Sequence, residues 1–109
     1  MVKANVSVDL LTSIKLYIDE ISKHYKIDYV VLFGSYAKGT NHENSDIDIA
    51  IISNDITDVF DDMAKLMSLT WGINTKIEPH PIKTENFKEN ESPFIDDIIQ
   101  TGIELYAAA

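Results

Sequence analysis

Segment 46–52 reads Asp-Ile-Asp-Ile-Ala-Ile-Ile, and this pattern restricts the possible folds of the chain more than any other. Side chains alternate between the two faces of a β-strand, so isoleucines would occupy one face and the carboxylates of Asp46 and Asp48 the other. Two like charges in a core strand are costly to desolvate unless a cation or strong hydrogen-bond donors compensate. The pattern therefore predicts a strand that is buried on one face and binds one or two divalent cations on the other.

A glycine-containing turn precedes this strand. Residues 29–33 are continuously apolar and rich in β-formers, which predicts a buried strand that ends at Gly34 and Ser35. Without a Cβ, Gly34 lets the backbone approach a phosphate, to which the Ser35 hydroxyl can donate. Residues 34–45 are rich in turn formers and are expected to form a loop, with room for one helical turn. A phosphate beside paired carboxylates requires a metal between them, which indicates phosphoryl or nucleotidyl transfer.

Glu78 is the candidate for a third carboxylate in this site. It ends a strand predicted over residues 73–77, and we expect it to act as a metal ligand or general base. Pro79 and Pro81 are expected to end the pairing there, because proline cannot donate within a central ladder. His80 would share the face of Glu78, but a single histidine between prolines is interpreted as structural or solvated.

The remaining periodicities predict a small α/β (α+β) domain. Amphipathic helices are expected over residues 7–25, 55–70 and 93–102, a polar loop over 84–92, and a short apolar end over 103–106. The order of elements favours a mixed sheet of three to four strands with helices packed on one side. Residues 1–106 are interpreted as one domain, and the alanines at 107–109 as an artificial addition.

Composition narrows the possible chemistry and partners. The 109 residues include no cysteine and carry a net charge of −9, which excludes disulfides and thiolate sites and disfavours direct binding of nucleic acid. The sequence shows neither a signal peptide nor an apolar run long enough to cross a bilayer, so no membrane association is predicted. We therefore expect a soluble protein in the reducing cytoplasm.

The two polar segments together resemble a known signature. Residues 34–40 (Gly-Ser-Tyr-Ala-Lys-Gly-Thr) followed by residues 45–50 (Ser-Asp-Ile-Asp-Ile-Ala) resemble the motif of the DNA polymerase beta type nucleotidyltransferase superfamily. At this length the chain is most similar to the minimal nucleotidyltransferases, the antitoxin partners of HEPN-domain toxins. Lys38 replaces an arginine that is frequent in the family, and Glu78 replaces the commoner aspartate.

The resemblance implies a nucleotidyltransferase-like fold and a set of functional residues. Catalysis and binding of two Mg²⁺ ions would fall to Asp46, Asp48 and Glu78. ATP would be bound by Gly34, Ser35, Lys38 and Thr40.

The same resemblance implies transfer of AMP from ATP to a tyrosine of a HEPN ribonuclease toxin, in a hetero-oligomer with that toxin. One alternative is a non-catalytic antitoxin or binding module that masks its partner sterically. Another is nucleotidyl transfer to a small molecule. For the polar segments themselves, a turn followed by an exposed edge strand is the alternative without any site.

Overall fold

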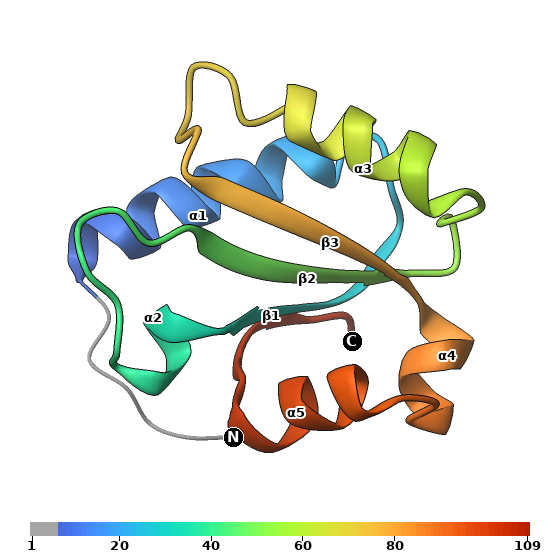
Figure 1. Ribbon diagram of the computed structural model, residues 1–109. Coiled ribbons are helices and arrows are strands. Elements are labelled where there is room, and N and C mark those ends of the chain that lie inside the picture. Colours follow the sequence, from blue (N-terminus) through green and yellow to red (C-terminus); the bar gives the residue numbers. More distant parts are fainter. Residues whose placement is uncertain (1–6) are drawn as a thin grey trace.

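The computed structural model describes residues 7–109, which form a four-stranded sheet with helices on it (Figure 1). The elements are α1 (Val8–Ile21), β1 (Ile27–Phe33), α2 (Ser35–Lys38), β2 (Ile47–Ser53), α3 (Val59–Ser68), β3 (Ile77–Lys83), α4 (Thr84–Glu89), α5 (Pro93–Thr101) and β4 (Ile103–Ala107). The strand order is β3-β2-β1-β4. Strand β2 runs parallel to β3, and the other two pairings are antiparallel. The predicted mixed α/β fold is confirmed.

Helices cover both faces of this sheet, which corrects the prediction that they pack on one side. Helices α1 and α3 lie on one face and α4 and α5 on the other (Figure 1). Along β2, Ile47, Ile49 and Ile51 belong to the core beneath α1, while Ala50 and Ile52 belong to a second core with residues of α5. The face that begins with carboxylates thus becomes apolar further along the strand, and it needs a helix to exclude water.

Strand β3 occupies Ile77–Lys83 rather than the predicted residues 73–77, and it contains both prolines. It is an edge strand, paired only with β2 among the described strands. Alternate residues direct their backbone groups to the same side, so Pro79 and Pro81 both leave the same side of β3 without a donor. The backbone of Lys76 accepts a bond from Ile47 N–H of β2 at 2.9 Å, which places the even-numbered residues toward β2 and the prolines toward the open edge.

The helix predictions are confirmed for α1, α3 and α5, each of which is shorter than expected. Residues 84–89 were expected in a loop, and they form α4 instead. This short helix is held by tertiary contacts: the Thr84 hydroxyl donates to Asp28 Oδ2 at 2.6 Å, and Phe87 packs on Tyr29 with ring centroids 5.7 Å apart. Local sequence does not specify such a helix, because most helical stability in proteins comes from packing.

The end of the chain completes the sheet. Strand β4 pairs antiparallel with β1 and places Ala107 opposite Tyr29, so the strand extends one residue into the terminal alanines. Residues 1–6 of the predicted domain lie outside the described residues. None of the helices in the described part of the chain has the length and apolar character needed to cross a bilayer.

Candidate active site

Gly34 connects β1 to α2 and lies directly against the Asp48 carboxylate. The pairing of β1 with β2 places Phe33 opposite Asp48, which brings the end of one strand beside the start of the other. Gly34 has φ +71° and ψ −150°, a backbone conformation essentially restricted to glycine. A Cβ at this position would overlap Asp48 Oδ2 and lie 3.3 Å from Asp48 Cγ. The backbone conformation therefore requires glycine here, and any Cβ would also displace the Asp48 carboxylate.

The predicted third carboxylate lies beside the paired aspartates. The parallel register of β2 and β3 places Glu78 opposite Asp48, and both side chains are half-buried. Glu78 also hydrogen-bonds to the carboxylate of Asp46, an exposed residue that precedes β2. The structure thus brings Asp46, Asp48 and Glu78 together, although they come from segments about thirty residues apart.

Crowding of the carboxylates changes the acidity of Glu78. Burial raises the pKa of Glu78 above its ordinary value, and the hydrogen bond with Asp46 raises it further, since only the protonated form of Glu78 can donate that bond. The charge of Asp48 acts in the same direction, while His80 lowers the pKa of Glu78. The net shift is upward, as expected where like charges meet without a cation.

His80 is part of this cluster, contrary to its interpretation as structural or solvated. Its Nε2 atom lies 3.1 Å from Asp48 Oδ1 and 3.6 Å from Glu78 Oε1. The imidazole ring packs edge-on against Phe33, with centroids 4.9 Å apart, and lies 6.0 Å from the ring of Phe94. The signal in the sequence was the spacing of two from Glu78, which places both side chains on one face of a strand.

Lys38 and Thr40 have a different placement from the carboxylates. Lys38 Nζ forms an exposed ion pair with Asp97 Oδ2 of α5 at 3.4 Å. Thr40 is exposed and donates its backbone N–H to the carbonyl of Ser35 at 3.0 Å, which closes the turn of α2. Ser35 is half-buried at the start of α2. A nucleotide-binding role for Gly34, Ser35, Lys38 and Thr40 stays a prediction.

The donor set suits a divalent cation. Carboxylate oxygens are preferred ligands of Mg²⁺, and Asp46, Asp48 and Glu78 supply three carboxylates at one place. One ligand atom each from Asp48, Glu78 and His80 lies within 4.8 Å of the others. Because Gly34 has no Cβ, the Asp48 carboxylate can lie directly against its backbone. The residues present therefore fit the predicted metal site.

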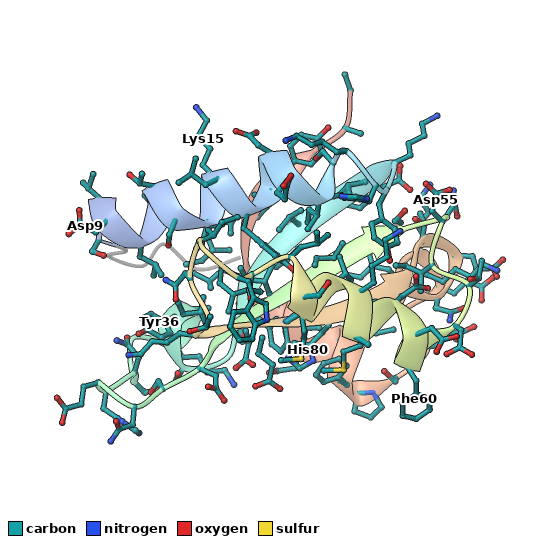
Figure 2. The ribbon with its side chains drawn as sticks, turned by 90° about the horizontal axis from the view of Figure 1, so that it is seen from above. Asp9, Lys15, Tyr36, Asp55, Phe60 and His80 are labelled. Carbon is teal, nitrogen blue, oxygen red and sulfur yellow. The ribbon has the colours of Figure 1, made fainter. Side chains whose placement is uncertain are left out.

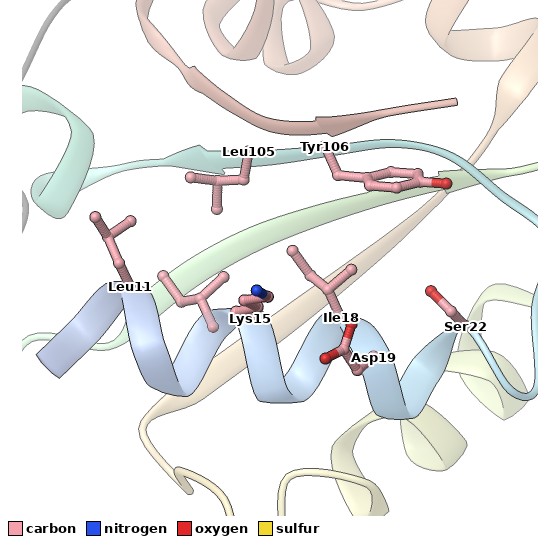
Figure 3. A pocket seen from close by; sticks show the side chains of 8 residues that line it. Leu11, Lys15, Ile18, Asp19, Ser22, Leu105 and Tyr106 are labelled. Atoms are coloured by element: carbon pink, nitrogen blue, oxygen red, sulfur yellow. The ribbon is translucent and has the colours of Figure 1, made fainter. Parts of the chain in front are cut away.

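The groove between α1 and β4 lies on the other face of the sheet. It has a volume of about 350 Å³. Figure 3 shows Leu11 and Ile18 of α1 facing Leu105 and Tyr106 of β4 across this groove. The face of β2 that carries Asp48 packs against α5, so the groove is separate from the carboxylate cluster.

Known proteins resemble this chain in sequence. The family described as "Polymerase beta, Nucleotidyltransferase" matches residues 17–109. The chain belongs to this family. One relative, from Methanocaldococcus jannaschii, is named as a candidate protein adenylyltransferase. It is 34% identical to this nucleotidyltransferase over 98 residues, which cover 86% of the chain and 95% of the relative. The protein adenylyltransferase MntA of Shewanella oneidensis is 51% identical over 45 residues, which cover 41% of the chain and only 30% of MntA.

Solved structures share the fold of this nucleotidyltransferase. A candidate nucleotidyltransferase from Sulfolobus solfataricus superposes with a TM-score of 0.65 at 19% identity, covering 89% of this chain and 79% of that one. A toxin-antitoxin complex crystallised with AMP-PNP superposes with a TM-score of 0.58 at 27% identity, covering 94% and 75%. A third structure, in which tri-AMPylated HEPN toxin of S. oneidensis is bound to its MNT antitoxin, gives 0.53 at 20% identity, covering 93% and 74%.

Proposed function

We propose that this nucleotidyltransferase is an antitoxin that transfers AMP from ATP to a tyrosine hydroxyl of a HEPN ribonuclease toxin. One observation carries the proposal: the turn at Gly34 lies against the carboxylate of Asp48, which lies opposite Glu78. Such a juxtaposition suits a bound nucleotide whose phosphates share a cation with the carboxylates. The relatives named protein adenylyltransferases and the AMP-PNP complex support ATP as donor and a protein as acceptor.

Each group of the site has a proposed role in this reaction. Asp46, Asp48 and Glu78 would hold Mg²⁺, and Gly34 and Ser35 would receive the triphosphate on backbone and hydroxyl donors. When bound, divalent cations lower the pKa of an attacking hydroxyl and neutralise the charge of the leaving pyrophosphate. The acceptor oxygen forms a bond to the α-phosphorus while the bond to the pyrophosphate oxygen breaks, and the hydroxyl proton is released. The protein's own part is to hold both reactants at the start of β2.

The charge of the chain suits the proposed partner. With 18 acidic against 9 basic residues, its net charge of −9 attracts a basic protein such as an RNA-binding ribonuclease. The same charge disfavours competition from RNA itself, and the absence of direct nucleic-acid binding stays a prediction. A reducing cytoplasm, where ATP is available, stays the expected compartment.

The test separates catalysis from steric masking. Wild type and the variant Asp46→Asn with Asp48→Asn are each mixed with a tenfold excess of a HEPN toxin, ATP and MgCl₂, and the toxin's mass and ribonuclease activity are followed. We expect the wild type alone to add AMP to the excess toxin and to inactivate it. The control variant Asp9→Asn with Asp19→Asn removes the same charge from exposed positions of α1 and should behave like wild type.

Other outcomes refute the proposal. Protection by wild type and the site variant alike, reached only at equimolar ratio and without a change in mass, would establish steric masking. If pyrophosphate is released while the toxin stays unmodified and AMP is found on small molecules instead, the small-molecule alternative is established.

A further inference from the structure

His80 lies inside the carboxylate cluster, and the proposed reaction does not yet use it. Its Nε2 atom is 3.1 Å from Asp48 Oδ1 and 3.6 Å from Glu78 Oε1. Adjacent ligands on an octahedral divalent ion, each about 2.1 Å from the ion, are separated by about 3 Å. His80 Nε2 and Asp48 Oδ1 therefore have the spacing of neighbouring ligands around one ion, and one ligand atom each from Asp48, Glu78 and His80 lies within 4.8 Å of the others.

We propose that His80 is a nitrogen ligand of the cation bound by Asp48 and Glu78, and that this site binds Mn²⁺ more tightly than Mg²⁺. The inference rests on the proposed function for the presence of a cation, and it adds which ion the site selects. Mg²⁺ is bound mainly through oxygen, whereas imidazole nitrogen suits first-row transition ions. A site with one nitrogen and several carboxylate oxygens therefore favours Mn²⁺ at equal concentration.

The sheet and its packing orient His80 for this role. The parallel register places His80 opposite Ala50, whose small side chain leaves room for the imidazole to lean toward Asp48. The rings of Phe33 and Phe94 lie 4.9 Å and 6.0 Å from the imidazole and limit its movement away from the carboxylates. The His80 side chain, which lies near the middle of the molecule in Figure 2, is 23% exposed and is largely held by protein. The side chains of Asp48 and Glu78 are 26% and 37% exposed, so the cluster stays accessible to an ion.

A second role for His80 would produce the opposite result. An imidazolium that merely offsets the negative charges of Asp48 and Glu78 would compete with a cation for the same carboxylates. Removing it would then strengthen the binding of every divalent ion. A nitrogen ligand, in contrast, contributes to binding, and its removal weakens the affinity for Mn²⁺ far more than that for Mg²⁺.

The experiment detects the nitrogen directly on the full chain, without nucleotide or toxin. Pulsed electron paramagnetic resonance of the Mn²⁺-loaded protein should show coupling between the ion and a bound nitrogen-14 nucleus. Labelling the histidines with nitrogen-15 should replace this coupling by that of nitrogen-15. Coupling should be absent from His80→Gln and retained in the matched control His24→Gln, since His24 is an exposed residue after α1. Calorimetric titrations should show that His80→Gln binds Mn²⁺ at least about tenfold more weakly, with the Mg²⁺ affinity changed about twofold or less.

The outcomes distinguish this inference from the proposed function. Wild-type protein without nitrogen coupling, or a His80→Gln variant that binds Mn²⁺ as tightly as or more tightly than wild type, would overturn ligation by His80, and the isotope-labelled wild type decides this even if the variant does not fold. If toxin is still adenylylated in that case, the proposed function stands. If nitrogen coupling and the Mn²⁺ preference are found but no AMP transfer occurs, the ligand assignment stands and the proposed function is wrong.

Discussion

Replacing Gly34 by alanine tests the geometry of the site most directly. The new methyl group would overlap Asp48 Oδ2 and lie 3.4 Å from Asp48 Cβ, so the carboxylate would have to turn away. The hydrogen bond between Asp48 Oδ1 and His80 Nε2, at 3.1 Å, would be lost as the carboxylate moved. The substitution should therefore destabilise the fold and displace a proposed metal ligand at the same time.

The magnitude follows from two contributions. A residue other than glycine at φ +71° and ψ −150° costs about 1–3 kcal/mol, and loss of the hydrogen bond between Asp48 and His80 adds about 1 kcal/mol. We expect Gly34→Ala to lower the free energy of unfolding by about 3 kcal/mol. Gly39→Ala is the matched control, because Gly39 also has a positive φ, +74°, but no neighbouring atom lies within 4 Å of its added Cβ. Its cost should be about 1 kcal/mol, from backbone strain alone.

Urea denaturation measures the two variants against wild type, with equal slopes required for the comparison. Calorimetric titration with Mn²⁺, under conditions in which both variants are folded, measures the second effect. Gly34→Ala should bind the ion weakly or not at all, while Gly39→Ala should bind as wild type does. Equal stability losses in the two variants, together with unchanged binding by Gly34→Ala, would show that contact with Asp48 has no part in organising the site.

Further substitutions test individual interactions. Asp62 accepts hydrogen bonds from the Tyr25 hydroxyl at 2.7 Å and from two backbone N–H groups. Burial acts to raise the pKa of Asp62, but these bonds lower it, and the net shift is downward. The contribution of Asp62 to stability is therefore present above the unfolded-state pKa and is lost as pH falls through the lower folded-state pKa. Asp62→Asn should therefore lower the free energy of unfolding by about 1–2 kcal/mol at neutral pH and flatten the acid limb of the stability profile, and a variant with an unchanged acid limb would contradict this assignment. Burial, and then Asp46, raise the pKa of Glu78, so without metal the ionisation of Glu78 destabilises the fold as pH rises. Glu78→Gln should therefore raise the melting temperature of chelator-treated protein at neutral pH. It should also remove the increase in melting temperature that added Mg²⁺ produces in wild type. Lys38→Met should change the free energy of unfolding by less than about 1 kcal/mol, because the ion pair with Asp97 is exposed. If the same substitution weakens ATP binding as much as the substitution of a site residue does, Lys38 belongs to the nucleotide site.

The central strand and its carboxylates could be predicted because their signal is local. The alternation that begins with Asp46 and Asp48 and continues through isoleucines determines which side chains share a face, and this period of two holds wherever the strand is placed. Gly34 could be predicted for a similar reason, since a glycine that ends an apolar strand marks a turn. The candidate third carboxylate, Glu78, was identified correctly as a neighbour of the aspartates even though its strand was misplaced.

The tertiary structure decided what depends on neighbours distant in sequence. Pro79 and Pro81 are compatible with β3 only because that strand lies at an edge of the sheet, and no local pattern states where the edge is. Helix α4, which contains Phe87, forms because the ring of Phe87 packs on that of Tyr29 in β1. His80 became a member of the site through the register that places it beside Asp48, since the distance between two ligands on different strands is set by hydrogen bonding between those strands and not by either sequence alone.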